Sequence, residues 1–277
     1  MTVATALRTA AGALASHSDT PRLDAELLMA HALGASRSDL LLRHMHDPVP
    51  PAFAGLVERR VADEPVAYIL GRQEFFGLEF IVSPDVLIPR ADSETLVEQA
   101  IAGRPDAGRV LDCGTGSGAL LLAALAHLPG AHGTGIDRSA GAIAVAGENA
   151  ARLGLSGRAR FLLTDWSVPG WKETLDAPFD LILANPPYVE SEAELAPSVR
   201  RFEPAGALFA GVEGLDAYRA LIPQIGPLLA PEGLALFEIG AGQADAVAGL
   251  AGECGYRAEL FRDLAQRPRV LALSRLW

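Results

Sequence analysis

This chain contains very little cysteine: Cys113 and Cys254 are the only two among its 277 residues. Two cysteines are too few for a disulfide framework, and Cys113 falls in a short apolar segment that we expect to be a buried strand. A secreted protein held together by disulfides is therefore excluded, and a reducing, cytoplasmic compartment is expected.

Long hydrophobic runs are also missing. No run reaches 18 apolar residues, the length that a membrane-spanning helix requires. The N-terminus shows no basic segment followed by an apolar core and a small-residue cleavage site, which is the pattern of a secretory signal. We therefore expect no membrane span and no secretion.

Positive charge is scarce. The chain has 23 Lys and Arg residues against 34 Asp and Glu residues, giving a net charge of −11 at pH 7. A protein that binds the phosphate backbone of nucleic acid usually carries a basic face, so direct nucleic-acid binding is not expected. An acidic surface would instead suit a cationic cofactor or a basic protein partner.

Several catalytic signatures are absent as well. The sequence has no HExxH or CxxC spacing, no P-loop lysine and no motif order of a Ser/His/Asp hydrolase. His31, His44 and His46 lie near one another in the sequence without a carboxylate at metal-ligand spacing. We therefore expect no metal site.

The organisation of the chain is that of one large domain with a smaller one before it. The first part has the periodicity of amphipathic helices, one of them marked by Pro21 at its start and Gly34 at its end. A hairpin pattern around Gly77 follows. The chain therefore divides into an N-terminal helical bundle domain (1–72), a β-hairpin linker (73–90) and an α/β catalytic domain (91–277).

Strands and helices alternate in the third part, after a helix over 94–102 that we expect Asp92 or Ser93 to cap. This alternation predicts a parallel sheet with helices on both faces. No helix separates the last two strands, so the final strand is expected to run antiparallel at the sheet edge. Strands are predicted at 110–113, 134–137, 159–163, 179–184, 234–239, 256–261 and 270–273, with helices at 119–128, 139–153, 215–229 and from 241.

The first strand–helix turn of the α/β part is Gly114-Thr115-Gly116-Ser117-Gly118. Glycines let the backbone turn sharply and admit a ligand closely, and the following helix presents free N–H groups. With Ala119 the loop also satisfies the dinucleotide pattern G-x-G-x-x-A, and Asp137 follows about 20 residues later, where an acid binds ribose hydroxyls. Both nicotinamide cofactors and S-adenosylmethionine present such a ribose.

The fourth strand ends in Asn185-Pro186-Pro187-Tyr188. Two prolines fix φ at about −65° twice and offer no N–H, so this corner is stiff. The Asn185 side-chain oxygen and the Pro186 carbonyl can accept the two protons of a planar NH2 group, while Tyr188 covers its face. Such a corner favours S-adenosylmethionine over a hydride-transfer cofactor, and Asp112 lies where the cofactor's amino group would be placed. A simple proline-rich turn is the alternative.

Thr164-Asp165-Trp166 ends the third strand. An acid and an aromatic ring at this position could hydrogen-bond to an adenine and stack on it. The alternative is that Trp166 only packs against the edge of the sheet.

These motifs together resemble the release factor glutamine methyltransferases, the PrmC (formerly HemK) family. The resemblance covers nearly the whole chain, and Leu87–Glu94 favours this branch over the related ribosomal-protein branch. Three positions depart from the family pattern: Ala91 replaces a proline, Ser93 a threonine and Cys113 an apolar residue. The matching segments are Glu64–Gly71, Glu74–Leu78, Leu87–Glu94, Leu111–Gly118, Asn185–Tyr188, Gly214–Arg219 and Phe237–Gly240.

The resemblance implies a fold and an activity. The fold would be that of a class I S-adenosylmethionine-dependent methyltransferase, with a Rossmann-like seven-stranded sheet whose last strand is antiparallel. The enzyme would transfer a methyl group to the side-chain nitrogen (N5) of the glutamine in the Gly-Gly-Gln motif of bacterial class 1 peptide chain release factors. The helical domain would help to grip the release factor, and the enzyme is expected to be a monomer.

The resemblance also implies a role for each matching residue. The methionine part of the cofactor would be lined by Gly114, Thr115, Gly116, Ser117 and Gly118. Asp137 would bind the ribose, and the adenine would lie against Asp165 and Trp166. The substrate glutamine would be bound by Asn185, Pro186, Pro187 and Tyr188, of which Asn185, Pro186 and Tyr188 would be catalytic and Asn185 would also border the cofactor.

Three alternatives stay open at this point. Methylation of a ribosomal-protein glutamine is the nearest, and methylation of DNA adenine uses a similar Asn/Asp-Pro-Pro-Tyr corner. The acidic balance of the chain argues against DNA. A scaffold that binds the cofactor without turnover is the third.

Overall fold

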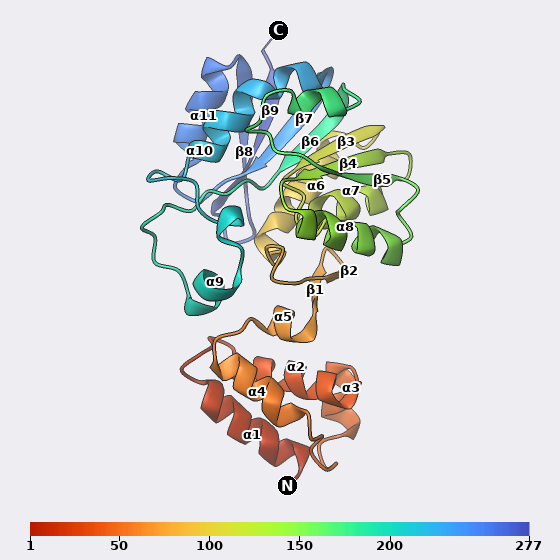
Figure 1. The fold of residues 1–277 in the computed structure, drawn as a ribbon, viewed down its shortest axis with the longest axis vertical. Coiled ribbons are helices and arrows are strands. Elements are labelled where there is room, and N and C mark those ends of the chain that lie inside the picture. The colour runs from red at the N-terminus through yellow and green to blue at the C-terminus, as the bar shows by residue number, and fades with distance from the viewer. Residues whose placement is uncertain (277) are drawn as a thin grey trace. The chain divides into compact units, whose positions relative to one another are not determined.

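The computed structural model describes residues 1–276, which form two compact units (Figure 1). The first comprises Met1–Arg72 together with Leu195–Phe202. The second comprises Gln73–Glu194 and the described chain from Glu203 onward. The first unit is therefore not continuous in sequence, because it includes a segment taken from the middle of the α/β part.

The first unit is a helical bundle, as predicted. Pro21 opens its second helix, and Gly34 ends that helix in the left-handed conformation at φ 65°. Leu7, Leu28 and Leu40 are fully buried between the helices. The helices of this unit are α1 (Val3–Leu14), α2 (Pro21–Leu33), α3 (Arg37–Arg43), α4 (Phe53–Val61) and α5 (Val66–Leu70).

The segment Leu195–Phe202 adds a short helix, α9 (Pro197–Phe202), to this unit. Arg201 donates from Nη1 to the carbonyl of Ala62 at 3.3 Å and to Oδ2 of Asp63 at 3.2 Å. The other oxygen of Asp63 lies 2.9 Å from Nδ1 of His17. These contacts hold α9 on the bundle, and the local sequence of α9 does not predict them.

A hairpin follows the bundle, with strands β1 (Arg72–Phe75) and β2 (Leu78–Ile81). Its turn places Phe76 at φ 53° and Gly77 at φ 74°. The hairpin is anchored through the backbone N–H of Phe76, which donates to Glu94 Oε1 at 2.9 Å. The predicted hairpin is thus present.

The second unit contains a seven-stranded sheet in the order β5-β4-β3-β6-β7-β9-β8. The strands from β3 to β7 run parallel, and β9 runs antiparallel to both of its neighbours. The strands are β3 (Arg109–Cys113), β4 (His132–Asp137), β5 (Ala159–Leu163), β6 (Phe179–Ala184), β7 (Leu229–Glu238), β8 (Tyr256–Arg262) and β9 (Pro268–Arg275).

The antiparallel direction of the last strand is confirmed, but its predicted place at the edge is wrong. β9 lies between β7 and β8, and β8 forms the edge. The burial of the two strands explains the order: Val270–Leu273 is buried throughout, whereas β8 is mostly exposed or half-buried. A continuous apolar run belongs inside a sheet, and a strand with charged residues belongs at its edge.

Helices cover both faces of this sheet, as predicted (Figure 1). α6, α7 and α8 pack on one face, and α10 and α11 pack on the other, each face with its own apolar core. β6 supplies both cores, since Leu181 and Leu183 join one while Ile182 and Ala184 join the other. These helices are α6 (Glu94–Gly103), α7 (Ala119–His127), α8 (Ala140–Arg152), α10 (Asp216–Leu221) and α11 (Ala244–Glu253).

Two local predictions are wrong. The α-helix predicted over 215–229 ends at Leu221, and two 3-10 turns follow it. Pro223 and Pro227 have no backbone N–H to donate, so the α-helix cannot continue. Neither predicted side chain makes a capping hydrogen bond to α6: Ser93 occupies the N-cap position without one, and Asp92 lies in the 3-10 turn that leads into the helix. Asp92 accepts from Arg269 Nη2 at 2.8 Å, and the Ser93 hydroxyl faces Asn185.

Candidate active site

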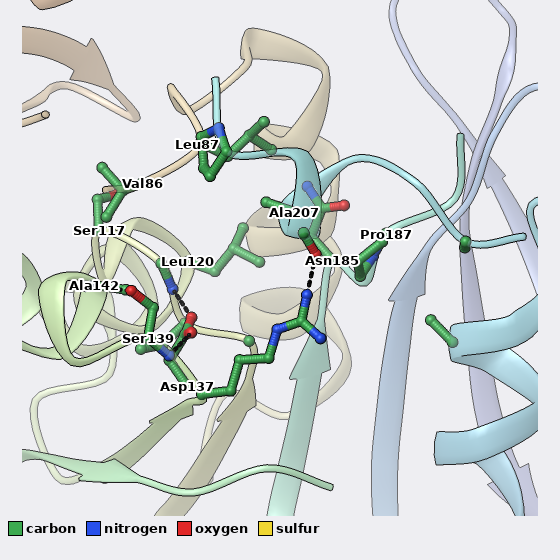
Figure 2. Close-up of a pocket in the computed structure, with 18 of the residues that line it drawn as sticks. Val86, Leu87, Ser117, Leu120, Asp137, Ser139, Ala142, Asn185, Pro187 and Ala207 are labelled. Carbon is green, nitrogen blue, oxygen red and sulfur yellow. Dashed lines mark hydrogen bonds between the residues drawn. The ribbon is translucent and has the colours of Figure 1, made fainter. Parts of the chain in front are cut away.

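A cavity of about 410 Å³ opens at the carboxyl ends of the central strands (Figure 2). This is the edge at which open α/β sheets bind ligands. Figure 2 shows Asn185 and Pro187 on one side of the cavity and Ser117, Asp137 and Ser139 on the other. The lining comes from the second unit only, chiefly from 85–90, 114–120, 137–139, 164–167, 204–211 and 216–220.

The glycine loop forms part of the cavity wall through Gly114–Ser117, whereas Gly118 is not part of the lining. Gly114, Gly116 and Gly118 all have positive φ, at 78°, 53° and 80°, which an L side chain rarely adopts. A Cβ on Gly114 would lie 3.1 Å from the ring of Trp166, so the ring packs directly over the loop. The predicted turn is therefore present and is closely fitted by its neighbours.

Asp112 lies behind this loop and is fully buried. Its Oδ2 accepts from the Thr115 hydroxyl at 2.6 Å, while Oδ1 has no hydrogen-bond partner among residues 1–276. Burial raises the pKa of Asp112 to about 7, against the opposing hydrogen bond from Thr115. An unpartnered buried acceptor of this kind suits a bound cation, such as the amino group of an amino acid.

Asp137 ends β4 and faces the cavity. Its Oδ2 accepts from the Gly116 N–H at 3.0 Å and its Oδ1 from the Ser139 N–H at 2.9 Å. One carboxylate therefore fixes both the glycine loop and the start of α8. Each oxygen keeps a lone pair for a further donor, such as a hydroxyl.

Asp165 and Trp166 also line the cavity. Burial acts to raise the pKa of Asp165, but hydrogen bonds from the Ser167 N–H and hydroxyl and the charge of Arg138 hold it below its ordinary value. Asp165 is therefore ionised at neutral pH. Trp166 packs against the core on one face of the sheet and also borders the cavity.

The roof of the cavity consists of the segments 85–90 and 204–211, held together by Glu203. Glu203 is 6% exposed; it pairs with Arg90 and accepts from the Ile88 N–H at 3.3 Å. Arg138 donates from Nη2 to the Gly206 carbonyl at 3.0 Å from the opposite wall. These contacts hold the roof over the cavity.

The proline corner is divided between the cavity and the interior. Asn185 and Pro187 lie on the cavity wall, whereas Pro186 is buried and Tyr188 is not part of the lining. The Tyr188 hydroxyl donates to Glu238 Oε1 at 3.3 Å. Burial and the Glu238 charge raise the pKa of Tyr188 to about 12, so the hydroxyl stays protonated at neutral pH.

Sequence reasoning missed the residues that support this corner. Glu238 is 1% exposed at the end of β7, and burial raises its pKa against hydrogen bonds from Ser93 and Tyr188 and the charge of Arg269. The available signal was that Glu238 is the single acid in the predicted strand over 234–239, which is otherwise apolar. An acid at the carboxyl end of a parallel strand belongs at the ligand edge of the sheet.

Gln243 is a second support that sequence reasoning missed. Its Nε2 donates to the Tyr188 carbonyl at 3.0 Å and to the Gly214 carbonyl at 3.2 Å, and its Oε1 accepts from the Gly240 N–H at 3.0 Å. One amide thus ties three loops together behind the corner. No local pattern around Gln243 predicts contacts so distant in sequence.

Comparisons with known proteins agree with this geometry. The PrmC N-terminal domain family model matches residues 5–71, and a methyltransferase domain model matches residues 105–211. The release factor glutamine methyltransferase of Rhodospirillum rubrum is 45% identical over 266 residues, covering 93% of this chain and 80% of its own length. That of Cereibacter sphaeroides is 43% identical over 280 residues, covering 98% of each chain.

This chain belongs to the release factor glutamine methyltransferase family. The ribosomal protein L11 methylase from Lactobacillus delbrueckii subsp. bulgaricus, a solved structure, shares the fold with a TM-score of 0.51 and 24% identity, over 71% of this chain and 84% of its own. The predicted class I methyltransferase fold with an N-terminal helical domain is thereby confirmed.

As a member of the release factor glutamine methyltransferase family, the chain is an enzyme that uses S-adenosylmethionine. The residues present fit this cofactor, since the glycine loop and Asp137 line the cavity and the unpartnered Oδ1 of Asp112 is buried just before that loop. Within residues 1–276 no cluster of three or more metal-binding side chains occurs, and no helix has the length and apolarity of a membrane span.

Proposed function

We propose that this enzyme methylates the side-chain amide nitrogen (N5) of the glutamine in the Gly-Gly-Gln motif of peptide chain release factors. Relatives that are 43–45% identical over nearly the whole chain and named release factor glutamine methyltransferase support this reaction. The observation that carries the proposal is the stiff Asn185–Tyr188 corner, whose Asn185 side chain borders the same cavity as the glycine loop.

The cofactor would occupy the cavity between the loop and the roof. Gly114, Thr115, Gly116, Ser117 and Gly118 would surround its methionine part, with the amino group near the unpartnered Oδ1 of Asp112. The ribose hydroxyls would donate to Asp137. Asp165 and Trp166 would border the adenine, and Asn185 would border the methyl group that is transferred.

A carboxamide nitrogen is a weak nucleophile, because its lone pair is delocalised into the carbonyl group. The cofactor supplies a methyl group already activated by a positively charged sulfur. The chain has to hold the amide so that its nitrogen faces that methyl group in line. Positioning of this kind can lower a barrier by roughly 7–11 kcal/mol.

Asn185 and Pro186 perform this positioning in our proposal. The Asn185 Oδ1 and the Pro186 carbonyl each accept one N–H of the substrate amide, which turns the nitrogen lone pair toward the methyl group. The same two acceptors stabilise the positive charge that develops on the nitrogen. Pro187 shapes the wall beside the amide, and Tyr188 closes the corner from behind, where Glu238 holds its hydroxyl.

The partner follows from the same proposal. A release factor would be the protein substrate. The proposed domains are a helical domain (1–72), a linker (73–90) and a catalytic domain (91–277), and the helical domain would help to bind the release factor. We further propose that the enzyme acts in the cytoplasm as a monomer. The charge of −11 suits a basic protein surface.

The experiment uses the full chain with S-adenosylmethionine and purified release factor, followed by mass spectrometry of the tryptic Gly-Gly-Gln peptide. We expect a gain of one methyl group on the glutamine. Parallel incubations with ribosomal protein and with duplex DNA test the two rival substrates. Methylation of either rival but not of the release factor would overturn the proposal, as would cofactor binding without turnover on all three.

A further inference from the structure

Glu238 lies directly beside the catalytic corner, although it does not line the cavity. Ala184 of β6 pairs with Phe237 of β7, so Asn185 and Glu238 are the next residues along two neighbouring parallel strands. Glu238 is 1% exposed, and its Oε2 has no hydrogen-bond partner of ordinary geometry among residues 1–276. A buried carboxylate at this place is costly and requires an explanation.

Ser93 connects Glu238 to Asn185. The Asn185 Nδ2 donates to the Ser93 hydroxyl oxygen at 3.4 Å. Ser93 is 3% exposed, and a hydrogen bond from its hydroxyl lowers the pKa of Glu238 against the effect of burial. Because the Ser93 oxygen accepts from Asn185, the hydroxyl proton of Ser93 is left to donate to the Glu238 carboxylate.

The direction of this chain of hydrogen bonds matters for the proposed reaction. An asparagine amide can flip, which exchanges its oxygen with its NH2 group. With Nδ2 on Ser93, Oδ1 is left for the substrate NH2 group, which it can accept. In the flipped state two NH2 groups would face each other, and the substrate amide could not be held.

We propose that Ser93 and Glu238 are positioning residues that fix the amide orientation of Asn185, so that its oxygen meets the substrate nitrogen. This inference rests on the proposed function, because it assigns Asn185 the role of acceptor. Arg269 supports Glu238 as a nearby buried cation that also pairs with Asp92 and Asp263. Ser93 and Glu238 act through Asn185 and do not touch the reacting atoms.

The kinetic test is a double-mutant cycle with Ser93→Ala and Asn185→Asp. A carboxylate presents oxygen in either orientation, so Ser93 has nothing to fix when residue 185 is Asp. We expect Ser93→Ala to lower the single-turnover rate constant about tenfold in the Asn185 background, equivalent to about 1.4 kcal/mol. In the Asn185→Asp background the same change should lower single-turnover rates less than about twofold. Equal losses in both backgrounds would overturn the inference.

Two further variants act as matched controls. Ser93→Thr keeps the hydroxyl and should restore most of the rate lost in Ser93→Ala. Tyr188→Phe removes the other hydrogen bond to Glu238 without acting on the Asn185 flip, so its loss should be the same in both backgrounds. A Ser93→Thr variant as slow as Ser93→Ala would contradict a role for the hydroxyl.

Nuclear magnetic resonance supplies a readout that needs no turnover. The side-chain NH2 signals of Asn185 are assigned in ¹⁵N-labelled protein by their loss in Asn185→Asp. We expect slow hydrogen exchange of this group in the wild type and at least tenfold faster exchange in Ser93→Ala and Glu238→Gln. Unchanged exchange of the Asn185 NH2 group in both variants would contradict the inference. Protected Asn185 signals in an enzyme that does not methylate release factor would contradict only the proposed function.

Discussion

Replacing Gln243 by Glu should weaken the contacts that hold the Asn185–Tyr188 corner, although the two side chains are nearly equal in size. The variant keeps Oε1 as acceptor for the Gly240 N–H, but it loses the Nε2 donor that binds the carbonyls of Tyr188 and Gly214. It also sets a carboxylate against two carbonyl oxygens. The position is half-buried, so water compensates only part of the loss.

The magnitude follows from the two hydrogen bonds that are lost. Each contributes about 0.5–1.5 kcal/mol, so we expect the free energy of unfolding of the second unit to fall by about 1–3 kcal/mol. We expect kcat to fall more than the affinity for S-adenosylmethionine, because Gln243 holds the Tyr188 backbone and does not line the cavity. A Glu that protonates could donate again, so activity should partly recover as the pH is lowered.

The assay is urea unfolding followed by tryptophan fluorescence. The two described tryptophans, Trp166 and Trp171, both lie in the second unit, so the signal reports on that unit. Gln266→Glu is the matched control, since it makes the same change at an exposed side chain. A Gln243→Glu enzyme with wild-type stability and wild-type kcat would refute the reasoning.

Three other predictions concern the cavity itself. Asn185→Ala should abolish methylation of release factor while the cofactor dissociation constant changes little; near-normal methylation would remove Asn185 from the mechanism. Asp137→Ala should raise that dissociation constant at least tenfold by calorimetry, and an unchanged value would show that the ribose assignment is wrong. For Asp112, whose folded-state pKa of about 7 exceeds its unfolded value, stability of the unliganded enzyme should fall as the pH rises from about 4 through 7. Asp112→Asn should weaken this pH dependence in urea unfolding from pH 5 to pH 8, and an identical profile would contradict the buried carboxyl.

Much of the fold follows from local patterns in the sequence. β6 and the glycine loop were predicted because an apolar run, a pair of prolines and a set of glycines each restrict the backbone locally. The misplaced β9 shows the limit, since strand order depends on which apolar segment fills the gap between β7 and β8. The predicted helix over 215–229 is too long for a local reason, because Pro223 and Pro227 interrupt its backbone hydrogen bonds.

The residues that line the candidate site are predictable from the sequence, but the residues that hold them in place are not. Gly114, Asp137 and Asn185 stand next to strand ends, where sequence alone indicates the ligand edge. Ser93 and Gln243 reach the corner from positions far away in the chain, through contacts that only the folded sheet creates. The local pattern at Ser93 predicts a helix cap, because a serine before an acidic first turn is typical of one.

The position of α9 bears on any attempt to study the catalytic unit alone. The chain passes from the Asn185–Tyr188 corner to α9, which packs on the N-terminal bundle through Arg201, and then returns to supply 204–211 of the cavity roof. Deleting residues 1–72 would therefore leave α9 without its partner and free the segment that leads into the roof. A shortened enzyme that binds its cofactor poorly would reveal this lost tether, and would say little about which surface the release factor touches.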